Sequence, residues 1–450
     1  MKTKFFAIAA LAATTLFASC NRDKDDINIL EESGKATSMK VSISFPNVPQ
    51  TRATGDLNAT EDEAKVNTVD VFIYYTATGG FQSHTHLKAD AFTSAGTAGN
   101  ADLYTANTKI DTTTGAKSVF AGINLPSSVV EALQYQPLSA LATVAHTMMP
   151  ADLTASSGFA MFSTEAVNRV FEEDENALAN KITLKCQRMV AKVTVETTAG
   201  MEQGGVPGTL GVLEFAVNNF NTKLFMLQGV PEYHKDPNWA IGSFAASDFI
   251  TNPVGTDYAP VLRRVQGDNP SMKTDYKARY AAENSSEGKL KKEITRVTVR
   301  STFIPEKVTV YTNRLDNTAG YELDAPHGGT TPQTFYAITP SVTEGTFYFF
   351  SKAIADNFAA DHSAEILTYV NGLCYWDIFL NKNPINEVNK WDVLRNDLYK
   401  CRITRIVTPG RPSPEVPNPE IKPEDVETNI TADIEILFWN TPIESNYVLE

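Results

Sequence analysis

The sequence predicts an all-β fold, built from antiparallel sandwiches with a few short helices. Many short runs alternate polar and apolar residues or are rich in β-branched residues, as strands are. Clusters of Gly, Ser, Thr, Asn and Pro separate these runs, and helical patterns are sparse. With 450 residues, 42% of them hydrophobic, the chain is long enough to bury the cores of two or three domains.

The chain begins with the pattern of an export signal. Lys2 and Lys4 precede an apolar run, Phe5–Phe17, which is too short to span a bilayer comfortably. The run closes on "LFASC" and resembles a bacterial lipobox, in which Cys20 would be acylated and become the first residue of the exported protein; the alternative is an ordinary signal peptide. A polar tether follows, and its Lys24–Asp26 is similar to surface-export signals of Bacteroidetes lipoproteins. We therefore expect the protein to lie on the outer surface of a Gram-negative outer membrane.

The stretch "KVSISFPNVPQTRATG" begins as a strand and ends as a loop. Alternation places Val41, Ile43 and Phe45 on one face of that strand. Two prolines then limit further sheet pairing, and Arg52–Ala53 follows among small polar residues that a protease could reach.

The remaining elements follow in order. Further strands are expected at residues 66–77, 118–125, 181–197, 210–220, 296–304, 307–312, 345–354, 400–408 and 432–439. Short helices are expected at Ser127–Tyr135, which opens with a serine cap, and at Pro384–Leu394.

The acidic Phe171–Lys181 suggests a domain break, with the glycine-rich Thr198–Gly208 as a competing boundary. The expected organisation is a signal peptide at 1–20, a propeptide with the first strand at 21–52, an N-terminal sandwich at 53–180, a C-terminal sandwich at 181–408, and a linker with a terminal strand at 409–450.

Pro409–Asp425 carries six prolines in seventeen residues. Such a segment favours polyproline II geometry at roughly 3.1 Å per residue, or about 50 Å of reach. The strand beyond it need not pair within its own chain. That strand places Ile434, Ile436 and Phe438 on one face, and so repeats the pattern β-branched, x, Ile, x, Phe of the first strand.

Composition and motifs exclude several functions. The net charge of −14 disfavours nucleic acid as a partner, because phosphate binding requires clustered Lys and Arg. Enzyme signatures such as GxSxG, HExxH and the P-loop are missing, so no catalytic residue, cofactor or enzymatic activity is expected. His84 and His86 share one face of a strand, but without a third ligand in the sequence nearby we expect a polar strand and no metal. The odd number of cysteines after Cys20 allows at most one disulfide within the chain.

Several segments together resemble the major fimbrillins of Bacteroidales type V pili, the FimA/Mfa kind. These are the lipobox, "VSISFP...TRAT", "VNTVDVFIYY", "KSVFAGINLP", "RMVAKVTV" and "NKWDVLRNDLYKCRITRI", and their order carries the resemblance. The C-terminal block is most similar to the Mfa branch of stalk subunits.

The resemblance implies two transthyretin-like β-sandwiches and assembly by strand exchange. Family members reach the surface as lipoproteins, and an Arg-specific protease removes the leader that carries the lipid and the first strand. The groove so exposed receives a C-terminal strand from the next subunit. The matching positions here are Cys20 for lipidation, Arg52–Ala53 for cleavage, Val41, Ile43 and Phe45 for the leader strand, and Ile434, Ile436 and Phe438 for the donor strand. The implied partners are other copies of the chain and related tip and anchor subunits, in a surface fimbrium that supports adhesion to a ligand the sequence does not identify.

Two alternatives stay open from the sequence. One is a surface glycan-binding lipoprotein of a nutrient-uptake system, which would keep its lipid and residues 21–52. The other is a tip or anchor subunit of the same fimbrium; a tip would lack a donor strand and an anchor would lack the cleavage arginine.

Overall fold

The structure is a computed structural model that describes residues 34–46, 61–98, 101–205, 207–228, 235–251, 255–266, 277–313, 319–380, 390–423 and 430–438. The chain divides into two compact units, Met1–Gly34 and Lys35–Glu450. All the helices and strands that the structure describes belong to the second unit.

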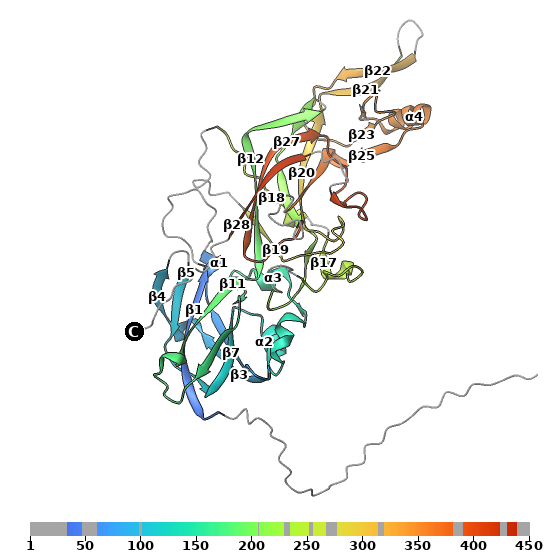
Figure 1. Ribbon diagram of the computed structural model, residues 1–450. Helices are drawn as coiled ribbons and strands as arrows, with labels where there is room; N and C mark the ends of the chain where they lie inside the picture. Colours follow the sequence, from blue (N-terminus) through green and yellow to red (C-terminus); the bar gives the residue numbers. More distant parts are fainter. Residues whose placement is uncertain are drawn as a thin grey trace, which may run out of the picture. The chain divides into compact units, whose positions relative to one another are not determined.

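The first sandwich is built around one continuous path of strands (Figure 1). Its strands are β1 (Ala36–Pro46), β2 (Thr68–Tyr75), β3 (Phe81–Lys88), β4 (Phe92–Ala98), β5 (Ala101–Ala106), β6 (Ile110–Thr113), β7 (Gly115–Ile123), β9 (Met161–Ser163), β10 (Val167–Phe171) and β11 (Lys181–Arg188). The path runs β3-β2-β7-β9-β11-β1-β5-β4, with β10 beside β7 and β6 beside β1.

Successive side chains of β2 and β7 point to opposite faces of the sheet and so contribute to two separate cores. One row of their side chains joins Val41, Ile43 and Phe45 of β1 in the core of the first sandwich. The other row, with Phe72 and Phe120, packs beneath the short helices and against residues of the second sandwich. Both strands are therefore buried on both faces.

Short helices cover this second face. They are α1 (Glu61–Ala64), α2 (Ser127–Leu133), α3 (Pro150–Leu153) and the 3₁₀ turns Ala89–Ala91, Leu138–Ala142 and Leu178–Asn180. The helix expected from Ser127 is confirmed, but the serine cap is wrong. Pro126 is the N-cap residue and Ser127 is already helical, so no side chain caps this helix.

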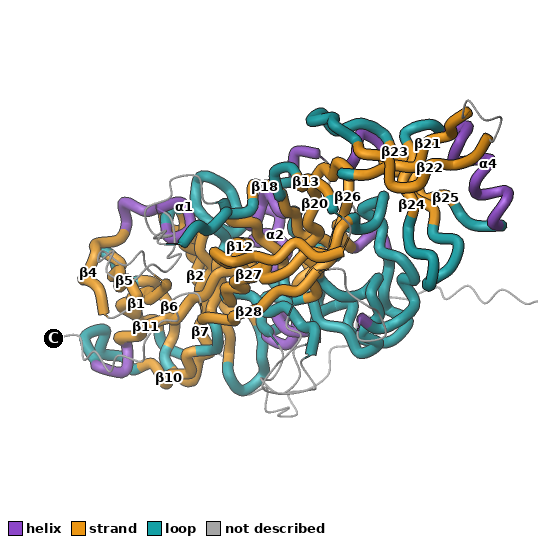
Figure 2. Tube along the Cα trace, turned by 90° about the horizontal axis from the view of Figure 1, so that it is seen from above, coloured by secondary structure: helices purple, strands orange, loops and turns teal. Residues whose placement is uncertain are grey.

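The second sandwich brings together strands from distant parts of the chain (Figure 2). Its main strands are β12 (Val190–Gly205), β13 (Gly208–Leu210), β14 (Glu214–Asn218), β18 (Ala259–Pro260), β19 (Ala278–Ala282), β20 (Arg296–Pro305), β26 (Leu373–Phe379), β27 (Asp397–Thr408) and β28 (Ile430–Phe438). Smaller elements are β8 (His146–Thr147), β15 (Phe220–Asn221), β16 (Lys223–Leu224), β17 (Phe249–Ile250) and the 3₁₀ turns Ala246–Asp248 and Gly255–Asp257. One sheet runs β19-β12-β27-β28, and another runs β13-β20-β14-β18 with β26 beside β20.

A small lobe lies between β20 and β26, which pair directly with each other. It holds β21 (Lys307–Asn313), β22 (Ala319–Pro326), β23 (Phe335–Ile338), β24 (Phe347–Phe349), α4 (Lys352–His362), β25 (Ile366–Tyr369) and the 3₁₀ turn Val370–Gly372. The strand expected at residues 345–354 is right only for β24. β24 ends at Phe349, and the Ser351 hydroxyl then accepts a hydrogen bond from the Ile354 N–H and caps α4.

The single strand expected at residues 181–197 is two strands in two different sheets. β11 pairs with β1 and β9 in the first sandwich, whereas β12 pairs with β19 and β27 in the second. The change of sheet falls at the buried Met189 rather than at residue 181. The sequence does mark this junction, because the apolar positions change from even numbers (182, 184 and 186) to odd numbers (191, 193 and 195) on either side of it.

The expected helix at Pro384–Leu394 falls partly outside the described residues, since 381–389 are not among them. Within the described part no helix forms, because Val393 makes an antiparallel bridge with Asn284.

The predicted all-β class, two sandwiches with minor helices, is confirmed. Pairing is antiparallel throughout the described strands except for two parallel pairs, β1 with β11 and β12 with β27. None of the described helices has the length and apolar character needed to cross a membrane.

Candidate functional site

The first strand, β1, occupies an interior position of its sheet. It runs parallel to β11 from Lys40 to Ser44. On its other side it pairs antiparallel with β6 through Ala36–Met39 and with β5 through Ser42–Pro46. β1, the first of the described strands, is thus hydrogen-bonded along both edges.

The side chains predicted to face the core do so. Val41 is 0% exposed, and Ile43 and Phe45 are each 1% exposed. The Phe45 ring stacks on Tyr104 of β5 with 5.3 Å between ring centroids. These three residues are part of the core that β2, β7 and β11 share.

The opposite face of β1 is polar and also largely covered. The Ser42 hydroxyl lies 2.9 Å from that of Thr105. The Asn180 side-chain amide donates to Thr37 Oγ1 and to the Ser38 carbonyl oxygen, each at 3.1 Å. Because Asn180 itself is 0% exposed, it fastens the beginning of β1 to the turn before β11.

The predicted lipidation and cleavage residues, Cys20, Arg52 and Ala53, lie outside the described residues. The chain is described again from α1, where Glu63 is 0% exposed. Its carboxylate accepts from Lys192 Nζ at 2.9 Å and 3.1 Å, and its carbonyl oxygen accepts from Arg188 Nε at 2.8 Å. Burial lowers the pKa of Lys192, and the Glu63 carboxylate opposes that effect. Sequence reasoning missed this buried cluster, because a single acidic residue in an acidic chain gives no signal.

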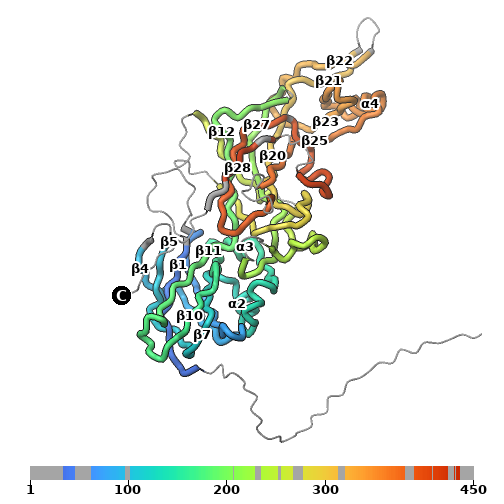
Figure 3. The backbone as a smooth tube through the Cα atoms, in the orientation of Figure 1, coloured from blue at the N-terminus to red at the C-terminus, as the bar shows by residue number. Residues whose placement is uncertain are grey.

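The predicted donor strand, β28, lies beside β27 in its own chain (Figure 3). In the register of this antiparallel pair, Ile434 faces Cys401, Ile436 faces Tyr399 and Phe438 faces Asp397. The expectation that this strand need not pair within its own chain is therefore corrected for the single chain. Among the described strands, β28 pairs with one and β1 pairs with three.

β28 contributes modestly to the core of the second sandwich. Ile430 is buried at 5% exposure, and Ala432 and Ile434 pack against the core while staying partly exposed. Glu435 forms an ion pair with Arg402 of β27 at 2.8 Å.

The proline-rich linker is not free over its described part. Arg411 exchanges two backbone hydrogen bonds with Tyr375, each 2.9 Å long, and Arg411 also pairs with Asp377 at 2.7 Å. The Pro419 and Ile421 carbonyl oxygens accept from the N–H groups of Lys292 and Lys291. A reach of about 50 Å is therefore wrong for the single chain, because proline removes donors but leaves carbonyl acceptors that neighbouring strands and loops can satisfy.

His84 and His86 do not simply face solvent. One carboxylate oxygen of Asp70, on the neighbouring β2, is hydrogen-bonded to both His84 Nε2 and His86 Nδ1, at 2.8 Å each. Asp70 is 1% exposed, so the two imidazoles satisfy one oxygen of a buried carboxylate. No group of three potential ligands able to hold a metal ion occurs among the described residues.

The three cysteines after Cys20 are free thiols and buried. Burial raises the pKa of Cys186, Cys374 and Cys401 to about 12, so each thiol stays protonated at neutral pH. The single disulfide that the cysteine count allowed is not formed.

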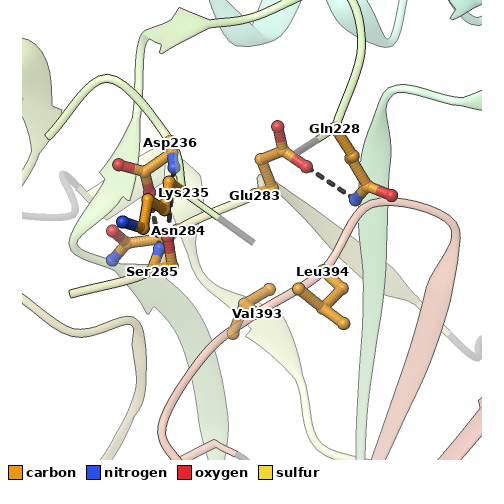
Figure 4. A pocket seen from close by; sticks show the side chains of 8 residues that line it. All are labelled: Gln228, Lys235, Asp236, Glu283, Asn284, Ser285, Val393 and Leu394. Atoms are coloured by element: carbon orange, nitrogen blue, oxygen red, sulfur yellow. Dashed lines mark hydrogen bonds between the residues drawn. The ribbon is translucent and has the colours of Figure 1, made fainter. Parts of the chain in front are cut away.

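A small polar cavity lies beside Asp236 and Glu283 in the second sandwich (Figure 4). Gln228 Nε2 donates to Glu283 at 2.8 Å, and burial raises the pKa of Asp236 to about 7. The cavity volume is about 10 Å³, which is the room of a single water molecule. It is too small for a substrate or a sugar.

Comparison with protein families gives two matches. The model of the major fimbrial subunit protein FimA matches residues 38–212, and the model of the C-terminal part of fimbrillin, major fimbrial subunit protein type IV, matches residues 367–444. A search of the curated proteins finds no match.

Among solved structures, a fimbrilin from Porphyromonas gingivalis is 14% identical to this chain, with a TM-score of 0.48; the match covers 90% of this chain and 99% of the fimbrilin. A protein described as a cell adhesion protein from Parabacteroides distasonis is 15% identical over the same shares, with a TM-score of 0.48. The tip fimbrial protein Mfa3 from Porphyromonas gingivalis, truncated at its C-terminus, is 14% identical, covers 88% of this chain over 99% of its own, and has a TM-score of 0.34.

The two family matches include most of β1 at one end and all of β28 at the other. Because they take in most of the first sandwich and both ends of the second, the chain belongs to the family of major fimbrial subunit proteins.

Proposed function

We propose that this fimbrial subunit builds the stalk, and that it polymerises after cleavage at Arg52 by exchanging its first strand for the last strand of another copy. The observation that carries the proposal is the position of β1. This strand fills the interior of a sheet and of a core, yet it precedes Arg52 and would leave with the propeptide.

Loss of β1 would leave two unpaired strand edges, on β11 and on β5 with β6. It would also empty the pockets of Val41, Ile43 and Phe45. Burying three such side chains is worth roughly 4.5 to 9 kcal/mol at about 1.5 to 3 kcal/mol each, before ordering costs. An open cleft of this kind would favour any strand of matching pattern.

β28 matches the pattern of the lost strand. Ile434, Ile436 and Phe438 would occupy the pockets of Val41, Ile43 and Phe45 without leaving a void at those positions. In the exchange, β28 would lose its pairing with β27 and would pair with strands on both sides of the cleft. Edge completion and core burial both favour the cleft.

The route to the surface is proposed from the sequence. Cys20 would carry the lipid of an outer-membrane precursor, and an Arg-specific protease would release the subunit between Arg52 and Ala53. The growing fimbrium would then join copies of this chain to related tip and anchor subunits.

Two measurements test the proposal. Mass spectrometry of surface-extracted protein should give Ala53 as the N-terminal residue, whereas retention of a lipid and of residues 21–52 would favour the glycan-binding lipoprotein instead. Purified protein cut after Arg52 should form ladders on unheated gels, and a chain ending before Ile430 should not. Because Ile430 also packs in the second core, the truncated chain should first be shown to be folded by circular dichroism. Ladders from a folded, truncated chain would refute strand exchange by β28.

A further inference from the structure

A row of positive charge lies along the wall of the β1 cleft. In the parallel register, Lys181 of β11 faces Lys40 of β1, and Lys185 faces Ser44. Residues two apart on a strand share a face, so Lys181 and Lys185 flank the position of Ser42. All three basic side chains are partly exposed.

The leader strand fits this row poorly. Lys40 stands directly opposite Lys181, and like charges in that position destabilise a sheet. The other leader residues on this face are neutral serines, Ser42 and Ser44, which offer the lysines no opposite charge. The apolar face of β1 is thus well matched to its site, while its polar face is not.

The terminal strand carries acidic residues at the corresponding positions. When Ile434, Ile436 and Phe438 are aligned with Val41, Ile43 and Phe45, Asp433 takes the position of Lys40 and Glu435 takes that of Ser42. Asp433 would then face Lys181, Glu435 would lie diagonally between Lys181 and Lys185, and Leu437 would take the position of Ser44 opposite Lys185. Diagonal neighbours on a sheet are within reach of long side chains such as these.

The same acidic pair already faces a basic row within its own chain. In the register of β27 with β28, Asp433 faces Arg402 and Glu435 faces Lys400. Glu435 is joined to Arg402 by an ion pair of 2.8 Å. A strand that pairs its acidic face with basic residues of β27 would find the same kind of partner on β11.

We infer that Lys181 and Lys185 are specificity-determining residues of the acceptor cleft, which select an incoming strand by the acidic pair Asp433 and Glu435. The inference rests on the proposed strand exchange and names the partner as a second copy of this chain. The apolar pockets favour both strands alike, whereas the lysine row disfavours the leader and favours its replacement.

One cost opposes this selection. Ser42 is 0% exposed, so a carboxylate in its place would lose water. The longer Glu435 side chain would carry its charge beyond the Ser42 hydroxyl toward the ends of the two lysine side chains. The Thr105 hydroxyl, which lies 2.9 Å from Ser42 Oγ, could donate to a carboxylate as well. Opposite charges and a donor are the conditions under which a half-buried carboxylate is tolerated.

The test uses protein cut after Arg52 and two synthetic peptides of residues 430–438, one native and one with D433K and E435K. The native peptide should bind the wild-type acceptor at least about tenfold more tightly than the K181E/K185E acceptor at low salt, and the difference should shrink at high ionic strength. The lysine-bearing peptide should reverse this order. K88E/K307E, at two exposed lysines away from the cleft, is the matched control and should bind like the wild type.

A second readout separates charge selection from simple damage to the fold. K181E should lower peptide binding far more than it lowers the stability of the uncut precursor, in which Lys181 stands opposite the like charge of Lys40. A variant that only harmed the fold would lower both precursor stability and peptide binding.

Each outcome bears on one proposal. If the wild-type cut protein binds neither the native peptide nor another copy, strand exchange itself fails. If the wild-type protein binds the native peptide and the K181E/K185E protein binds it equally well, the charge selection is wrong while strand exchange stands.

Discussion

Replacing Ile43 with alanine should destabilise the precursor strongly and leave the assembled polymer unchanged. Ile43 is 1% exposed and lies between Leu184 of β11 and Tyr104 of β5 in the register of the sheet. The substitution removes roughly three buried carbons at about 0.8 kcal/mol each, and the cavity left behind adds to that, so we expect a loss of about 2 to 5 kcal/mol. Under the proposed cleavage after Arg52, the altered side chain would leave with the propeptide.

The assay is denaturant unfolding of the uncut precursor, followed by the same measurement on polymer formed after cleavage. The midpoint of the I43A precursor should shift to lower denaturant with an unchanged slope, whereas wild-type and I43A polymers should unfold together. Ser44→Ala is the control, because it alters the same strand on its polar face. Equal destabilisation of precursor and polymer would show that β1 stays in the mature subunit, and would refute strand exchange.

Two further predictions concern buried charge. Glu63→Ala should destabilise the cut and the uncut protein alike by about 3 to 5 kcal/mol, because it leaves Lys192 buried without its carboxylate partner. Asp62→Ala changes an exposed neighbour in α1 and should have little effect in the same unfolding assay. Equal effects of the two substitutions would contradict a stabilising buried pair. Burial raises the pKa of Asp236, Asp392 and Asp397 to about 7, so these groups bind protons more tightly when folded, and the stability they contribute should fall as the pH rises from about 4 through 7. Melting curves at pH 5.5 and 8 should differ less for Asp397→Asn than for the wild type, and an unchanged difference would rule out that carboxyl as a source.

Much of the fold was predictable where a local pattern is strong. The strands at β2, β7, β20 and β27 follow from alternation, and so do the buried faces of Val41, Ile43 and Phe45. The prediction failed where a change in the pattern was read as one strand. The apolar positions change from even to odd numbers around Met189, where the chain passes from β11 to β12 and from one sheet to another, and the single strand predicted over residues 181–197 overlooked that change. Residues 352–354, expected within a strand, are helical because the rest of α4 packs on β23 and β24.

The candidate site shows the same division. The sequence placed the leader and terminal strands on the right segments, because their β-branched, x, Ile, x, Phe pattern is local. It could not place β28 beside β27 or join the linker to Tyr375 and Lys292, since those contacts connect residues far apart in the chain. The linker prediction assumed that proline alone sets the geometry, whereas neighbouring donors decide where its carbonyl oxygens bind.

By itself the sequence determined the all-β class, the export pattern, the two matched strands and the resemblance to fimbrillins. Each of these depends on residue type and spacing over a few consecutive positions. Only the tertiary structure decided which strands are neighbours: that β1 lies between β11 and β5, that Lys181 faces Lys40, and that Glu63 is buried against Lys192. Such pairings are settled by register and packing between distant segments, because the free energy of a strand depends on what covers its edges and faces.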